Sequence, residues 1–127
     1  ALTPTRDFNF VADTVSGMIA VLDNDKSIGE TINIGSGFEI SVGDTVKLIS
    51  ELTGKPLHVK TEEQRLRPQN SEVERLCCDH AKAKALLSWQ PKTTGLEGLK
   101  AGLAYSIEWF ANPENRKHYH DIHRYAV

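Results

Sequence analysis

Residues 67–91 read RPQNSEVERLCCDHAKAKALLSWQP and form the most informative stretch of the chain. A fixed cation, Arg67, and a carboxylate, Glu72, precede a short predicted helix that stops at a Trp-x-Pro sequence. A guanidinium group can donate two parallel hydrogen bonds to phosphate oxygens, and a carboxylate can accept hydrogen bonds from two hydroxyl groups. The pair therefore suits a ligand that carries a diphosphate and a diol, as a nucleotide sugar does. The alternative is that Arg67 and Glu72 are solvated partners in a surface loop.

Apolar periodicity and end signals predict helices and short strands along the rest of the chain. Asp13 is expected to cap the first helix, Ser41 the second and Asp79 the third, because short polar side chains accept from the first free amides of a helix. Gly54 is expected to end the second helix. The predicted helices cover about 13–22, 41–53, 79–87 and 96–110, and the predicted strands cover 5–11, 31–34, 57–60 and 73–78.

Length and composition are those of one globular domain. The chain has 127 residues, of which 39% are hydrophobic and 25% charged, which are ordinary fractions. A net charge of -2 argues against a general nucleic-acid binder, because such a protein needs a basic surface to displace counterions. No apolar run approaches the roughly 20 residues that span a bilayer, so no membrane partner is expected.

The cysteines and the first residues indicate the compartment. Cys77 and Cys78 are adjacent on a predicted strand, where neighbouring side chains point to opposite faces. They are expected to be buried free thiols of a reducing cytoplasm. No signal peptide is recognised after Ala1. The expected location is therefore cytoplasmic.

Several motifs, in order, resemble the C-terminal region of extended short-chain dehydrogenase/reductase enzymes, the NAD-dependent nucleotide-sugar 4,6-dehydratases and 4-epimerases. The likeness runs from about Thr3 to Phe110. In that family this region is a small, mostly helical α/β domain with two or three short strands. The resemblance implies a substrate-binding domain over 1–112 and a polar tail over 113–127. The motifs are Thr5-Arg6-Asp7-Phe8-Asn9-Phe10-Val11-Ala12-Asp13, Ile32-Asn33-Ile34-Gly35-Ser36, Arg67-Pro68 with Glu72-Val73, Asp79 with Lys82-Ala83, and Trp89-x-Pro91.

The resemblance also implies the residues that hold the ligand. Arg6 and Arg67 match arginines that contact the nucleotide diphosphate, and Glu72 matches the acid that accepts from ribose hydroxyls. The spacing between Arg67 and Glu72 is longer than in several relatives, so Arg65 competes with Arg67 for the phosphate role. The alternative for Arg6 is a structural pair with Asp7 or Asp13.

The turn at Asn33, Gly35 and Ser36 is a weaker candidate for substrate contact. It closes a predicted strand, and ligands of α/β proteins often bind at strand ends. Trp89 is expected to fill the core rather than to stack on a base. Both expectations can be checked against the packing of the folded chain.

No catalytic residue is assigned. The glycine-rich turn that receives a dinucleotide and the Tyr-x-x-x-Lys pair of these enzymes do not occur in the sequence. We therefore interpret the chain as a substrate-binding half without its N-terminal Rossmann domain, with no cofactor of its own and no activity alone. In the parent enzyme, NAD held by the absent domain would take a hydride from C4 of the sugar. Dehydration and epimerisation both stay open as the parent reaction.

A second hypothesis is a free-standing, self-associating interaction or ligand-binding module. Loss of a partner domain uncovers an apolar face, and such faces find partners. A homo-oligomer is therefore expected, formed through that face or by exchange of the first strand. The histidines of the tail (His118, His120 and His123) lack the companion ligands of a zinc site, so no metal is expected.

Overall fold

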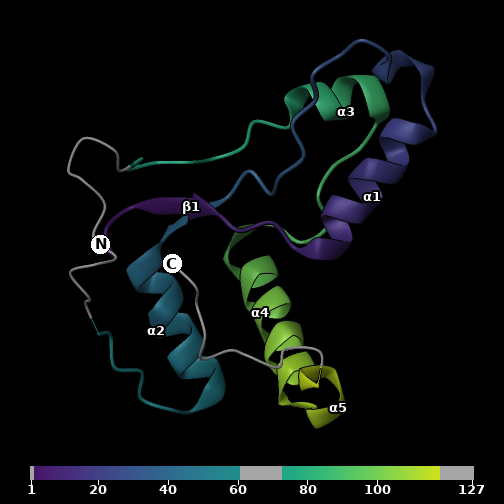
Figure 1. Ribbon diagram of the computed structural model, residues 1–127. Coiled ribbons are helices and arrows are strands. Elements are labelled where there is room, and N and C mark those ends of the chain that lie inside the picture. The colour runs from purple at the N-terminus through teal and green to yellow at the C-terminus, as the bar shows by residue number, and fades with distance from the viewer. Residues whose placement is uncertain (1, 61–72, 118–127) are drawn as a thin grey trace.

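The structure is a computed structural model that describes residues 2–60 and 73–117. Two groups of helices lie on either side of a short β-ribbon (Figure 1). One group contains α1 (Val11–Leu22) and α3 (Ala81–Leu87), and the other contains α2 (Val42–Thr53), α4 (Gly95–Ala111) and α5 (Pro113–Arg116). The expected small, mostly helical α/β domain is confirmed.

The ribbon consists of β1 (Thr5–Asp7) and β2 (Glu39–Ser41), which pair antiparallel with Arg6 opposite Ile40. A single parallel bridge adds Arg75 beside Thr5. The Arg75 Nε atom donates to both oxygens of Glu39 at 2.7 and 2.8 Å, and this hydrogen bond lowers the pKa of the Glu39 carboxyl. Three segments distant in sequence are thus held side by side.

The strand predictions were wrong at most positions. The first strand ends at Asp7 instead of Val11, and β2 was not predicted. None of 31–34, 57–60 and 73–78 is a strand; the last has only the bridge at Arg75. Residues 31–34, predicted as a buried strand, alternate in burial instead: Ile32 and Ile34 pack inward, while Thr31 and Asn33 are exposed. They form no ladder with any described residue.

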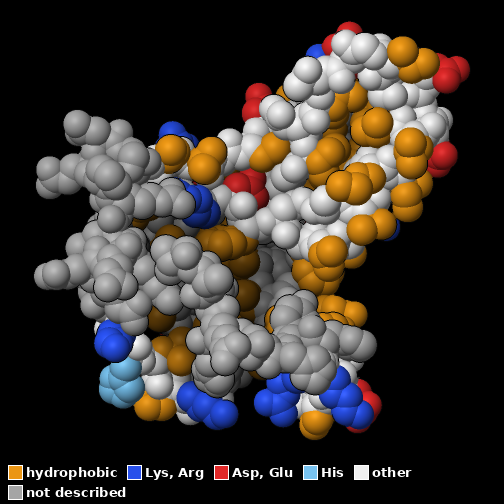
Figure 2. All heavy atoms as spheres, in the orientation of Figure 1, with side chains coloured by type: hydrophobic (Ala, Val, Ile, Leu, Met, Phe, Trp, Pro, Cys, Tyr) orange, Lys and Arg blue, Asp and Glu red, His pale blue; other side chains and the backbone are white. Residues whose placement is uncertain are grey.

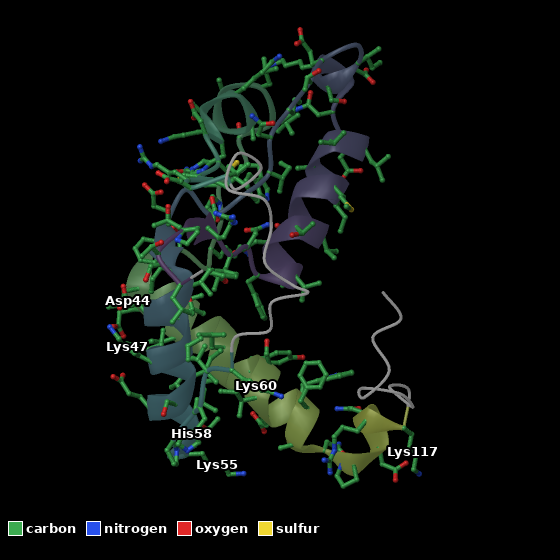
Figure 3. The ribbon with its side chains drawn as sticks, turned by 60° about the vertical axis from the view of Figure 1, so that its left-hand side comes forward. Asp44, Lys47, Lys55, His58, Lys60 and Lys117 are labelled. Atoms are coloured by element: carbon green, nitrogen blue, oxygen red, sulfur yellow. The ribbon has the colours of Figure 1, made fainter. Side chains whose placement is uncertain are left out.

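Helix α2 begins and ends where the sequence predicts. The Ser41 Oγ atom accepts from the Asp44 amide at 2.9 Å, which satisfies an amide that has no partner within the helix. Gly54 ends the helix with φ 64°, a left-handed conformation that costs glycine little. An ion pair between Asp44 and Lys47 at 2.8 Å lies on the outer face of its first turn (Figure 3). The segment after the helix carries Lys55, His58 and Lys60 (Figure 3).

The cap predicted for α1 was wrong. Phe10 occupies the N-cap position with no side-chain hydrogen bond, and Asp13 lies inside the helix, 2% exposed. The Asp13 oxygens accept from the amides of Lys92 and Thr93 at 3.0 and 2.8 Å. The carboxylate therefore holds the loop before α4 against α1 instead of starting the helix. For α3, the N-cap position is occupied by His80 instead of the predicted Asp79, although Asp79 accepts from the Ala81 amide at 2.8 Å.

The buried core is small and centred on Trp89. This side chain is 6% exposed and packs with Ala83 and Leu87. Its Nε1 atom donates to Ser16 Oγ on α1 at 2.9 Å, so the indole links α1 to the segment after α3. The expectation that Trp89 fills the core is confirmed. Partly buried side chains around this cluster are Ala20, Val21, Ile32, Ile34 and Leu86.

Helix α1 presents much of its apolar face outward. Hydrophobic side chains follow α1 on the surface seen at the right of Figure 2. Met18 is 60% exposed and Leu22 is 84% exposed. We call this set the α1 stripe: Val11, Val15, Met18, Ile19 and Leu22. No helix of the described ranges is long and apolar enough to cross a membrane.

Candidate functional site

A pocket of about 560 Å³ lies where β1 meets two extended segments. It contains three of the sequence-predicted site residues, Arg6, Asn33 and Gly35. One wall is formed by residues 32–35 and the other by residues 76–79. The remaining lining residues are Asp7, Asn9, Ile32, Ile34, Leu76, Cys77, Cys78 and Asp79.

Backbone hydrogen bonds to Thr5 determine the position of the second wall, residues 76–79. The Thr5 amide donates to the Glu74 carbonyl at 2.8 Å, and the Leu76 amide donates to the Thr5 carbonyl at 3.2 Å. These bonds bring residues 74–76 beside β1. The chain then continues into Cys77 and Cys78, so the pocket wall follows directly from this pairing.

Close packing of the two walls depends on a glycine. A Cβ atom built at Gly35 would lie 2.3 Å from the Cβ atom of Cys78, a distance that real side chains do not tolerate. The absence of a side chain at Gly35 therefore allows the two segments to touch at Gly35 and Cys78. Gly35 has this structural reason to be glycine whether or not it contacts a ligand.

Asp7 lines the pocket and accepts hydrogen bonds from both sides of it. The Asp7 Oδ1 atom accepts from the amide and the hydroxyl of Ser36 at 3.1 and 2.5 Å. The Oδ2 atom accepts from the amides of Gly37 and Cys78 at 2.9 and 3.0 Å. Sequence reasoning missed this role because the partners lie 29 to 71 positions away. The only signal was the position of Asp7 next to Arg6 within the motif.

Arg6 is the cation that lines the pocket. Its Nη1 atom donates to the Thr5 carbonyl at 2.7 Å, which turns one end of the guanidinium back along the strand. Of the two acids suggested as alternative partners, Asp7 accepts four hydrogen bonds from Ser36, Gly37 and Cys78, and Asp13 accepts from the Lys92 and Thr93 amides. Arg6 lines the pocket together with Asn33 and Gly35.

Ser36 is buried at 3% exposed and does not line the pocket. Its hydroxyl donates to Asp7, and its carbonyl accepts from the Thr94 hydroxyl at 2.7 Å. Ser36 therefore supports the turn that follows Gly35. The remaining predicted contacts, Arg65, Arg67 and Glu72, lie outside the described residues.

The two cysteines differ from the sequence expectation. Both are free, but Cys77 is exposed and Cys78 is only half-buried. The prediction of two buried thiols on a strand was wrong, since residues 73–78 form only the single bridge at Arg75 and neither thiol is buried. Burial raises the pKa of the Cys78 thiol, and the nearby Asp7 carboxylate raises it further. The thiols therefore add no negative charge to the pocket at neutral pH.

The described residues do not form a dinucleotide phosphate site. Such a site needs free amides at the N-terminus of a helix that follows a glycine-rich turn. The Gly35-Ser36-Gly37 turn leads into β2, and the amides of Ser36 and Gly37 already donate to Asp7. No group of three His, Cys, Asp or Glu side chains within residues 2–60 and 73–117 is arranged to hold a metal ion.

Comparison with known proteins places these features in a family. The family described as GDP-mannose 4,6 dehydratase matches residues 1–101. The chain belongs to this group of NAD-dependent nucleotide-sugar epimerases and dehydratases, the extended short-chain dehydrogenases/reductases. The resemblance inferred from the motifs is thereby confirmed.

Individual relatives and solved structures agree with this family assignment. An uncharacterized UDP-glucose epimerase of Bacillus subtilis is 35% identical over 101 residues, which are 80% of this chain and 31% of that protein. An epimerase structure from Methanothermobacter thermautotrophicus matches with a TM-score of 0.73 and 34% identity, over 92% of this chain and 33% of that one. UDP-glucose 4-epimerase from Thermotoga maritima, solved with UDP-glucose, has a TM-score of 0.66 and 29% identity over 84% and 33% of the two chains. The chain thus spans about a third of the length of these relatives.

Proposed function

We propose that this chain is the nucleotide-sugar-binding portion of an NAD-dependent 4,6-dehydratase or 4-epimerase and that it catalyses no reaction alone. The observation that carries the proposal is the pocket that gathers Arg6, Asn33 and Gly35 between two extended segments. A relative of similar fold was solved with UDP-glucose. NAD would be held by a part of the parent enzyme that this chain does not match.

The ligand is expected to lie with its diphosphate beside Arg6. A guanidinium group can donate two parallel hydrogen bonds to phosphate oxygens, and such charge-assisted bonds contribute about 1.5–3 kcal/mol each. Asn33 has an exposed side chain on the facing wall and offers both a donor and an acceptor to the sugar or ribose. Arg67 and Glu72 are assigned from the sequence. Arg67 would also contact the diphosphate, and Glu72 would accept hydrogen bonds from the ribose hydroxyls.

Calorimetric titration with UDP-glucose tests this proposal. We expect saturable binding that Arg6→Ala weakens roughly ten- to a hundredfold, which is the loss of one charge-assisted contact. Lys26→Ala is the matched control, because Lys26 is an exposed cation on the 3-10 helix Asp25–Ser27, outside the pocket lining. Equal affinities of the wild type and Arg6→Ala would contradict the role of Arg6. Absence of binding with UDP-, GDP- and dTDP-sugars would contradict the function.

The exposed α1 stripe favours a second candidate, a self-associating module. Its side chains are 49% to 84% exposed, and contiguous apolar patches on soluble proteins mark interaction surfaces. In the parent enzyme the rest of the polypeptide would cover this face, whereas the isolated chain would cover it with a second copy.

Cys77 and Cys78, which are free, suit the reducing environment of the cytoplasm for either candidate.

Sedimentation velocity checks the association. We expect the wild-type chain to associate reversibly and Met18→Glu to remain monomeric, because a carboxylate in the stripe would have to lose its hydration in the interface. Leu57→Glu is the control, since Leu57 is 44% exposed and lies after α2, away from the stripe. A wild-type chain that stays monomeric at the highest attainable concentration would refute the second candidate.

A further inference from the structure

The Asp7 carboxylate joins three separate segments of the chain. It belongs to β1, and it accepts hydrogen bonds from Ser36 and Gly37 after the first wall and from Cys78 in the second wall. Three of the four donors are backbone amides. Asp7 is thus a hydrogen-bonded link between the two walls of the pocket.

These bonds occupy the carboxylate fully. An ionised carboxylate offers about four acceptor sites, and each Asp7 oxygen already has two donors. Asp7 therefore has no acceptor site left for the hydroxyl groups of a ligand. The converging amide dipoles also offset part of its negative charge, which lowers the repulsion that an anionic ligand beside Arg6 would meet.

The distance between the two walls of the pocket also depends on the Asp7 carboxylate. Gly35 and Cys78 are already in contact, so the two walls have little freedom to move closer. The bonds to the Gly37 and Cys78 amides prevent them from moving apart. Asp7 is also the neighbour of Arg6 on β1, and both line the pocket.

We propose that Asp7 is the positioning residue of the nucleotide-sugar pocket: its carboxylate fixes the spacing of residues 35–37 and 77–79 so that Arg6 and Asn33 meet one ligand. This inference rests on the proposed function. It assigns Asp7 no contact with the ligand, and its effect on affinity passes through the geometry of the two walls.

Asp7→Asn tests the inference because the new amide nitrogen cannot accept hydrogen bonds from two of the four donors. We expect faster hydrogen exchange at the Gly37 or Cys78 amide and a UDP-glucose dissociation constant raised roughly tenfold or more in the folded variant, since small displacements of positioning groups have large effects. The phosphorus NMR shifts of bound UDP-glucose should also change. Asp44→Asn is the matched control, because Asp44 likewise accepts hydrogen bonds with both of its oxygens but lies on α2, outside the pocket lining. It should leave the dissociation constant unchanged.

The outcomes separate the inference from the proposed function. If the wild type binds UDP-glucose and Asp7→Asn binds it equally well, the inference is wrong and the function stands. If the wild type does not bind, the function fails, and unchanged exchange at Gly37 and Cys78 in Asp7→Asn then overturns the role of the carboxylate as well. Should Asp7→Asn not fold, Ser36→Ala removes one donor to Asp7 and is expected to weaken binding by a smaller factor. An unchanged affinity in that variant would overturn the inference.

Discussion

Trp89→Ala is expected to lower the free energy of unfolding by about 3–5 kcal/mol, the usual range for removing a buried large aromatic side chain. Trp89 is 6% exposed and fills the space between Ala83, Leu87 and α1. The substitution also leaves Ser16 without its indole partner. Because small domains have a total stability of about 5–15 kcal/mol, a loss of this size would leave a substantial unfolded fraction.

Urea denaturation followed by circular dichroism measures this loss. Trp109→Ala is the matched control, because Trp109 is only partly buried on α4, where it contacts Phe110 edge to face. Its replacement should cost clearly less than that of Trp89. A loss at Trp109 equal to or larger than the loss at Trp89 would show that the core is centred elsewhere.

Asp13→Ala is expected to lower the free energy of unfolding by about 2–5 kcal/mol. The change removes the carboxylate that accepts from the Lys92 and Thr93 amides, and hydrogen bonds to a charged group contribute about 1.5–3 kcal/mol each. It also frees the loop that precedes α4. The thermal midpoint and the urea midpoint should therefore both decrease.

Asp23→Ala provides the comparison for Asp13. Asp23 is an exposed acid at the C-terminal end of α1, and surface substitutions of this kind usually change stability by less than about 0.5 kcal/mol. If Asp13→Ala were as mild as Asp23→Ala, the loop before α4 would be held by other contacts. Asp13 would then not be the residue that holds this loop against α1.

Local signals in the sequence predicted α1 to α4, whereas the short helix α5 was not predicted. The bounds of α2 follow from Ser41 and Gly54, and α4 follows from its apolar repeat and the Asn112-Pro113 stop. These signals depend on residues within a few positions of each other, so they can be recognised without knowing the fold. Helix α1 was predicted for the same reason.

Long-range partners explain most of the errors. Whether residues 31–34 and 73–78 become strands depends on which distant backbone segment lies beside them. The local sequence pattern does not reveal that partner. Asp13 was interpreted as a cap because a carboxylate near a helix start has the same local appearance whatever it binds. Its partners are 79 and 80 positions away.

The candidate site was predicted in part. Arg6, Asn33 and Gly35 were named from motifs, and the structure brings them into one pocket. The hydrogen bonds from Ser36, Gly37 and Cys78 to Asp7 were missed because they join segments 29 to 71 residues apart. The proposed roles of Arg65, Arg67 and Glu72 rest on the sequence alone.

The central claim is that a nucleotide sugar binds between residues 32–35 and 76–79. It is tested most directly by titrating isotopically labelled chain with UDP-glucose and following the backbone amide resonances by NMR. The account predicts saturable shifts at Asn33, Gly35 and Cys78 that are lost in Arg6→Ala. Shifts confined to a distant surface, such as the hollow between the end of α2 and Leu57, would contradict it.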